Sequence, residues 1–273
     1  AMAELMGRHF FESSSVDRIL GKFNSHLTDK VLVHANEALW GGDKRHAAAL
    51  TAMITDHTMA IEAKGIDVIQ EKNYVHLIMS SNSDWMVPAG PDARRFFVLD
   101  VGAMKRNDGD YFGALKSDLK NGGYSNLLHF LLDYDISEFN VRKPPMTEAL
   151  LDQKELTMSK EAQWWKNCLD LGTIGGSYDW PDRILVEDVY GSYIQEMKDI
   201  NHNYRLQPQA FGKFLHRICP DIRRARLQRD NAKKPYYILP PLEECREAFN
   251  LNMGGPFAWT EEEEIPRDGE IPF

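Results

Sequence analysis

Several features are missing from this sequence of 273 residues, and each absence excludes a class of protein. No apolar run approaches the roughly 20 residues that span a bilayer, so we expect no membrane partner. No basic stretch followed by an apolar segment opens the chain, so we expect no secretory signal. Cysteine is scarce, and Cys168, Cys219 and Cys245 match no metal-ligand spacing. We expect three buried thiols, no metal site and a reducing, cytoplasmic setting.

Two catalytic motifs are also missing. The sequence has no G-x-S-x-G, which argues against a small-molecule hydrolase. It has no glycine-rich loop ending in Lys and Ser/Thr, the motif whose backbone N–H groups cradle phosphates; "GGDKRH" and "GGYSN" lack that spacing. We therefore expect that this polypeptide alone neither binds ATP tightly nor hydrolyses it.

The composition is that of a folded protein. Hydrophobic residues make up 43% of the chain and aromatic residues 11%, enough for one α/β domain and a smaller one. The net charge of -9 argues against a surface that coats nucleic acid throughout. Any such contact must come from a local basic patch.

The first hundred residues alternate between helical and extended patterns. Helices are expected at 3–12 and 43–57, and an apolar strand between them at 31–35. Residues 58–73 predict two strands joined by a tight turn with Lys64 near its tip. Apolar strands follow at 74–82 and 93–101, which gives an α/β core.

From residue 110 the spacing of apolar residues is helical. Helices are expected at 110–121, 124–135 and 147–171, and the segment 172–182, with three glycines and a proline, predicts a linker and a domain boundary. Beyond it we expect helices at 186–200 and 207–217, a basic turn, a strand at 236–240 and a helix at 242–249. This order suits a winged-helix-like module. Trp164, Trp165 and Trp180 are expected to pack in the core rather than stack on bases.

Polar side chains stand where two of the predicted strands end. Asn36 and Glu37 follow the strand at 31–35, and Asn82 ends the strand at 74–82. A carboxylate at the carboxyl end of a strand can polarise a water or hold a metal, which is how strands feed reaction centres in nucleotide-hydrolysing folds. The alternative is an ordinary strand end with a surface glutamate.

Taken in order, these segments resemble the ATPase core of superfamily 3 helicases, in the form found in phage and plasmid primase-polymerase and primase-helicase proteins. The resemblance covers most of the chain. It rests on the segments "GKFNSHL", "NEALWGGDK", "IEAKG", "SSNSDWMVP", "ARRFFVLDV", "DYFGALKSDL", "GGYSNLLHFLLDYDIS", "KPPMTEALLDQK" and "YYILPPLEECREAF".

The resemblance implies roles for the strand-end residues. Glu37 would be the Walker B glutamate that orients the attacking water, and Asn36 would stand where an aspartate normally helps to hold magnesium. Asn82 would be the sensor that contacts the γ-phosphate. Either Arg94 or Arg95 would be an arginine finger reaching the neighbouring subunit's nucleotide; the alternative is surface ion pairing.

Two basic elements are candidates for nucleic-acid contact. By resemblance Lys64 would point into a central channel and follow the DNA backbone, although a lysine at a hairpin tip is often just solvated. The second element is either a phosphate- or subunit-contacting surface or a solvated helix end. It contains Arg223, Arg224, Arg226, Arg229, Lys233 and Lys234.

The resemblance also implies an organisation. We expect a P-loop NTPase-like ATPase core at 1–108, truncated just after the phosphate loop and lacking its strand, a helical extension at 109–172, the winged-helix-like module at 183–259 and an acidic tail at 260–273. The intact parent would be a ring-forming, hexameric DNA helicase that uses ATP and Mg²⁺ and binds single-stranded DNA, whereas this fragment would carry neither cofactor. The alternative is a non-catalytic DNA-binding or ring-assembly module on an ATPase-like scaffold.

Overall fold

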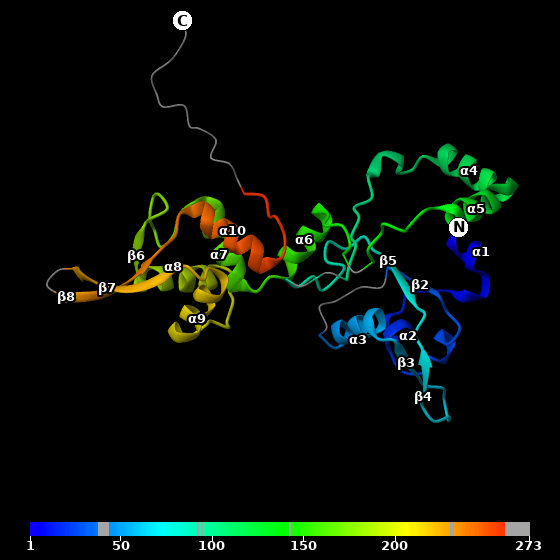
Figure 1. Cartoon of the computed structure of the whole chain (residues 1–273), viewed down its shortest axis with the longest axis horizontal. Helices are drawn as coiled ribbons and strands as arrows, with labels where there is room; N and C mark the ends of the chain where they lie inside the picture. The colour runs from blue at the N-terminus through cyan, green and yellow to red at the C-terminus, as the bar shows by residue number, and fades with distance from the viewer. Residues whose placement is uncertain (38–43, 92, 94, 142, 230–231, 260–273) are drawn as a thin grey trace, which may run out of the picture. The chain divides into compact units, whose positions relative to one another are not determined.

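The computed structural model describes residues 1–37, 44–91, 93, 95–141, 143–229 and 232–259. The chain divides into two compact units (Figure 1). Unit 1 is Ala1–Ala89 with Ala93–Gln153, and unit 2 is Gly90–Asp92 with Lys154–Phe273. The division thus falls at Lys154 rather than in the glycine-rich segment 172–182, which lies inside unit 2.

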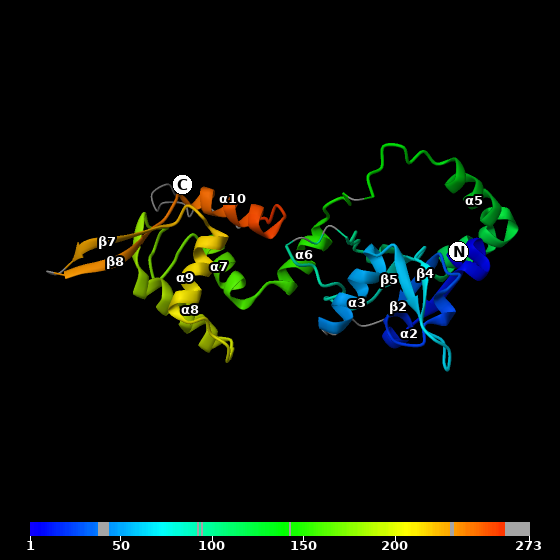
Figure 2. The ribbon, with the colours of Figure 1, turned by 60° about the horizontal axis from the view of Figure 1, so that its bottom comes forward.

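Unit 1 is built on a three-stranded parallel sheet in the order β1-β2-β5, formed by β1 (Phe10–Ser13), β2 (Leu32–Asn36) and β5 (His76–Ser80). One face is apolar: Val33 and Ala35 are buried with residues from α2 (Val16–Leu20) and α3 (Lys44–Thr55). Figure 2 shows these helices beside the sheet. The predicted strand at 31–35 is confirmed.

The expected helix at 3–12 is wrong in its second half. Helix α1 (Met2–Met6) ends at Gly7, whose φ of 52° lies in the left-handed region that favours glycine. A 3₁₀ turn, η1 (Gly7–His9), leads into strand β1. Because side chains alternate along a strand, Phe11 packs against the apolar face of the sheet.

The predicted hairpin is confirmed. Strands β3 (Thr58–Ile61) and β4 (Ile69–Lys72) pair antiparallel, and Lys64 is exposed in the turn between them. Asn24, which follows α2, holds the hairpin: its amide donates to the Ala60 carbonyl at 2.9 Å and accepts from the Glu62 N–H at 2.9 Å. The 3₁₀ turn η2 (Ser25–Leu27) follows Asn24.

The strand expected at 93–101 is not present among the described residues. The segment is irregular, with Val98 buried beside Val87 and Leu150 while Leu99 stays exposed. The alternating pattern did predict that one apolar side chain is buried, but no neighbouring strand pairs with the segment. The amide of Gln153 fixes the preceding loop, accepting from the Met86 N–H at 2.7 Å and donating to the Asp84 carbonyl at 2.5 Å.

The expected helices after residue 108 are confirmed as α4 (Gly109–Asp118) and α5 (Tyr124–Asp133), preceded by the 3₁₀ turn η3 (Ala103–Lys105). The segment η4 (Leu119–Gly123) between them is a kink, because Asn121 and Gly122 have non-helical backbone angles. Neither α4 nor α5 buries a residue in the described structure. Their apolar side chains are exposed, among them Leu132 at 76%.

Unit 2 begins within α6 (Glu148–Thr157), and the long helix expected at 147–171 is two helices. Helix α7 (Lys160–Leu171) starts anew because Ser159 caps it, its hydroxyl accepting from the Ala162 N–H at 3.4 Å. The remaining elements are β6 (Arg183–Leu185), α8 (Val186–Asp199), α9 (Pro208–Ile218), β7 (Arg223–Arg229), β8 (Ala232–Ile238) and α10 (Leu242–Met253).

An antiparallel sheet in the order β6-β8-β7 completes unit 2. The prediction of a basic turn after α9 is wrong, because residues 223–229 form strand β7. The core is aromatic, and the predicted packing of the tryptophans is confirmed. Trp164 and Trp165 are 3% and 0% exposed, and the Trp180 ring lies 5.8 Å from that of Trp165.

Two further groups in unit 2 are buried. The Lys154 ammonium donates to the carbonyls of Pro91, Met253 and Gly254 at 2.9, 3.1 and 2.6 Å, so it closes the carboxyl end of α10. All three cysteines are buried and free, as expected, and burial raises the pKa of the Cys168 thiol to about 12. Across the described helices, none is both long and apolar enough to cross a membrane.

Candidate functional site

Four polar side chains form a network on the face of the parallel sheet opposite the apolar one. Register places Glu12 beside His34 and Asn36 beside Ser80. The Ser80 hydroxyl lies 2.9 Å from Nε2 of His34 and donates to Oδ1 of Asn36 at 3.2 Å. The Asn36 amide donates to Oε1 of Glu12 at 3.0 Å, and Nδ1 of His34 lies 3.6 Å from the same oxygen. The three strands are thus linked by side chains near their carboxyl ends.

The two residues expected to face a reaction centre follow this network. Glu37 has a φ of 51° and donates its N–H to the Ser80 carbonyl at 2.7 Å. Asn82 lies two residues beyond Ser80, and both Glu37 and Asn82 are exposed. Because β2 and β5 are parallel, Glu37 and Asn82 both follow the carboxyl ends of their strands at one edge of the sheet. Their roles at a reaction centre stay predictions.

Sequence reasoning missed Glu12, His34 and Ser80. Glu12 was assigned to the predicted helix at 3–12, whose last residues belong to strand β1. His34 stands between the buried Val33 and Ala35, and alternation alone could have placed it on the polar face together with Asn36.

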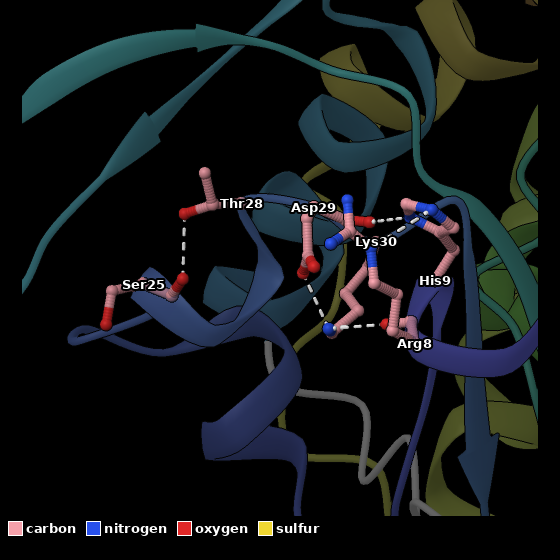
Figure 3. A network of polar contacts seen from close by, with 6 residues as sticks. All are labelled: Arg8, His9, Ser25, Thr28, Asp29 and Lys30. Atoms are coloured by element: carbon pink, nitrogen blue, oxygen red, sulfur yellow. Dashed lines mark hydrogen bonds and ion pairs between the residues drawn. The ribbon is translucent and has the colours of Figure 1, made fainter.

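The amino ends of β1 and β2 are held by a separate network (Figure 3). The Lys30 ammonium donates to the Arg8 carbonyl at 2.7 Å and to the Asp29 carboxylate at 2.6 Å, and the His9 ring contacts the Asp29 carbonyl at 2.7 Å. The hydrogen bond from Lys30 lowers the pKa of Asp29. In the adjoining turn the Thr28 hydroxyl donates to the Ser25 carbonyl at 2.7 Å. This network fixes the segments that lead into β1 and β2.

The remaining predicted residues of unit 1 stay apart from this edge. Arg94 lies outside the described residues, and Arg95 is exposed in an irregular segment. Lys64 is exposed at its hairpin turn. No hydrogen bond or ion pair links Arg95 or Lys64 to Glu37 or Asn82 in the described part of the chain. Neither the finger nor the channel role is tested by these positions.

The described residues do not by themselves fit a nucleotide with its magnesium ion. They contain no group of three or more His, Cys, Asp or Glu side chains placed to hold a metal. Asn36 turns its amide toward Glu12 and Ser80, and the sequence carries no phosphate loop. We therefore derive no reaction step through ATP or Mg²⁺.

The basic cluster of unit 2 is divided between the two faces of the β7-β8 hairpin. Cross-strand pairing puts Arg224 opposite Tyr237 and Arg226 opposite Pro235, and alternation places Lys233 on the same face. Arg223 and Lys234 belong to the other face, where Lys234 pairs with Glu187 at 3.1 Å. The side chain of Arg229 lies outside the described structure. The five residues whose side chains are described therefore lie on two faces of the hairpin rather than in one patch.

A hollow that the sequence did not reveal opens beside the Arg224 face. It is lined by α9 together with Val186, Arg224 and Tyr237. Burial raises the pKa of Tyr237, and the neighbouring Arg224 guanidinium opposes that rise. The signal was the spacing of Gln209, Lys213 and His216, which puts three polar side chains on one side of α9.

Comparison with known proteins gives both sequence and structural similarity. Residues 1–95 match the model of a family of unknown function, DUF5906. The chain is 27% identical over 104 residues to the DNA primase-polymerase of Nitratiruptor phage NrS-1, covering 36% of this chain and 14% of that protein.

Two solved structures share the fold. The apo structure of the NrS-1 C terminal region superposes with a TM-score of 0.59, and the A form of that region with 0.62. Each is 16% identical, and each match covers 88% of this chain and 62% of the other. The chain is therefore a mixed α/β protein with the fold of the NrS-1 C terminal region, and it spans less than two thirds of that region.

Proposed function

We propose that this chain is part of a phage-type DNA-replication protein. Unit 1 supplies the water-facing edge of a superfamily 3 helicase ATPase core, and unit 2 supplies a winged-helix-like nucleic-acid-binding module. The similarity to the NrS-1 primase-polymerase and its C terminal region supports the replication role. In the intact protein the ATPase would act with ATP and Mg²⁺, in a ring of subunits.

One observation carries the ATPase proposal. The central strand β2 ends in Asn36 and Glu37, its neighbour β5 ends in Ser80 just before Asn82, and the Glu37 N–H binds the Ser80 carbonyl at 2.7 Å. An exposed carboxylate and an exposed amide at one edge of a parallel sheet can orient a water molecule between them. The side-chain network from Glu12 to Ser80 holds the two strand ends in register.

The order of elements in unit 2 supports the nucleic-acid module. A helix (α7), a short strand (β6), two helices (α8, α9) and a hairpin (β7-β8) follow one another, and the first strand pairs with the last in the order β6-β8-β7. A winged-helix module, in which the hairpin would be the wing, has a similar order of elements, and this similarity supports the proposal.

The test concerns Glu37. In a polypeptide extended upstream of Ala1 by a strand and a phosphate loop, we expect ATP hydrolysis that DNA stimulates. Glu37→Gln should lower its rate by about 100-fold or more while nucleotide binding persists, because positioned proton-transfer groups contribute about that much. Glu71→Gln, an exposed position on β4, is the matched control. Unchanged hydrolysis in Glu37→Gln would rule out Glu37 as the residue that orients the attacking water.

A second candidate is a non-catalytic DNA-binding or ring-assembly module built on an ATPase-like scaffold. The amide at Asn36, engaged by Glu12 and Ser80, favours it, because an aspartate there would add a negative charge beside a metal. DNA binding without any hydrolysis in the extended polypeptide would select this candidate.

A further inference from the structure

The hollow beside α9 gathers positive charge. Its volume is about 600 Å³, and its described lining includes Lys213, His216, Arg217 and Arg224 but no carboxylate. Lys213, Arg217 and Arg224 are exposed, and no ion pair joins any of them to a carboxylate within the described part of the chain. Three cations without counter-charges thus surround one concave surface, which attracts an acidic ligand.

The same chain carries an acidic segment, residues 260–273. It contains six carboxylates and one arginine, and four of the carboxylates follow one another as Glu261–Glu264. A block of like charges repels itself and is stabilised by a surface of opposite charge. The hollow and this acidic tail are therefore complementary in charge.

The acidic tail starts within reach of the hollow. It follows Trp259, whose ring lies 5.6 Å from the Phe249 ring on α10. One turn along α10, the Asn252 amide donates to the Arg217 carbonyl at 2.8 Å, and Arg217 lines the hollow. At about 3.4 Å per extended residue, residues 260–264 span up to about 17 Å. With the lengths of a glutamate and an arginine side chain added, this span covers the path from Trp259 to Arg217.

The two cations beside Trp259 already have carboxylate partners. Lys166 and Arg246 lie 5.9 and 5.5 Å from the centre of the Trp259 ring. Lys166 pairs with Glu155 at 3.1 Å, and Arg246 pairs with Glu243 at 2.7 Å. The glutamates of the tail gain more from the unpaired cations of the hollow.

We propose that the acidic tail binds in the hollow of its own chain, with Glu261–Glu264 against Lys213, Arg217 and Arg224. Each contact between exposed charges is weak. The short connection offsets this weakness, because it holds the two groups at an effective concentration of about a millimolar. The bound tail closes the hollow to other polyanions until one of them displaces it. This inference goes beyond the proposed function and requires neither ATP hydrolysis nor nucleic-acid binding.

Zero-length cross-linking of the whole chain tests the contact. A carbodiimide condenses a glutamate carboxyl with the Lys213 amine into an amide and takes up the released water as a urea, and mass spectrometry locates the joined peptides. At low salt we expect the tail to join Lys213 at least about tenfold more often than Lys198, an exposed lysine outside the hollow, since two exposed ion pairs correspond to about that factor. Equal yields at the two lysines would overturn the inference.

Variants distinguish binding from simple proximity. Arg217→Gln with Arg224→Gln leaves Lys213 and the tail intact, and should lower the Lys213 cross-link about five- to tenfold. Arg183→Gln with Lys198→Gln, at exposed positions outside the hollow, is the matched control and should leave the yield unchanged. An undiminished cross-link in the first pair would overturn the inference. So would a cross-link that mostly joins isotopically labelled chains to unlabelled ones, because the contact would then lie between chains.

Heparin, a polysulfated sugar, tests whether the tail closes the hollow. A tail that occupies the hollow about four-fifths of the time leaves about one-fifth of the chains open, which weakens the apparent affinity about fivefold. Replacing Glu261–Glu264 by glutamine should therefore tighten heparin binding about fivefold relative to a control of equal net charge, and equal affinities would overturn the closure. The control carries amides at four exposed carboxylates of unit 2, namely Asp179, Asp182, Glu244 and Glu247.

These outcomes are separate from those of the proposed function. A chain that binds no DNA and hydrolyses no ATP would still give the cross-link and the heparin difference. Conversely, failure of both measurements would overturn the inference and leave the Glu37 experiment and the nucleic-acid role of unit 2 unaffected.

Discussion

The core of unit 2 and the α4–α5 segment of unit 1 have similar apolar spacing in the sequence but opposite burial. Trp165 is 0% exposed and lies among other rings, whereas Leu132 on α5 is 76% exposed and α4 and α5 bury no residue. Spacing determines which side of a helix is apolar. It does not determine whether anything covers that side. Unit 2 buries most of its large apolar side chains in its own core, whereas unit 1 leaves many of its own exposed to water.

The largest expected effect is therefore in unit 2. Trp165→Ala removes a ring that lies 5.9 Å from Trp164 and 5.8 Å from Trp180, and should lower the free energy of unfolding by about 3–5 kcal/mol. The matched change, Phe130→Ala on α5, removes a side chain that is 59% exposed and should cost less than about 0.5 kcal/mol. Denaturant titration measures both. Comparable losses would mean that Phe130 is covered in solution.

A smaller effect should appear in self-association. Exposed apolar patches favour association, so we expect the chain to associate as its concentration rises. Leu132→Glu should weaken this association about tenfold, which corresponds to about 1.4 kcal/mol and to the burial of part of one leucine. Leu251→Glu, at a position on α10 that is 86% exposed, is the control. Sedimentation equilibrium would contradict the prediction if both variants associated like the parent.

The smallest effect concerns the start of α4. Asp108 caps that helix: its carboxylate accepts from the Tyr111 N–H at 2.9 Å, and that bond, followed by the one from Lys105, holds the pKa of Asp108 below its usual value. The cap therefore contributes fully above the unfolded pKa of about 3.9 and is lost as the pH falls through the lower folded pKa.

Amide exchange at Tyr111 reports this cap directly. Its protection should fall on acidification in the parent, should be low at every pH in Asp108→Ala, and should lose its acid dependence in Asp108→Asn, which keeps an accepting oxygen. An exchange rate in Asp108→Ala equal to that of the parent at neutral pH would show that the carboxylate does not cap α4.

Local signals predicted much of the fold. The β3-β4 hairpin, strand β2 and helices α8 and α9 follow from alternation and helical spacing within short windows. Strand β1 was missed because its short sequence, "FFES", follows a helical start and has a partner 22 residues away: Phe10 pairs with Leu32. At 93–101 the error was in the other direction, because a strand was predicted where none forms. An extended pattern becomes a strand only when a neighbouring strand pairs with it, and a short window of sequence does not show whether one does.

The candidate sites show the same limit. Glu37 and Asn82 were found because each follows its own strand, and parallel pairing then brings them to one edge. The contacts of Asn36 with Glu12 and Ser80 depend on register between strands far apart in the sequence. On the hairpin, a run of basic residues looked like one patch. Only the pairing of β7 with β8 assigns Arg224 and Arg223 to different faces.

Neighbouring residues on α6 serve different units. Gln153 bonds the loop at Asp84 and Met86 in unit 1, and Lys154 bonds the carbonyls at the end of α10 in unit 2. Replacing one residue by an apolar analogue should loosen one unit, and replacing the next should loosen the other. Substitutions at two adjacent positions should therefore destabilise the two units separately. The stability of each unit could then be measured in the whole chain, without truncating it.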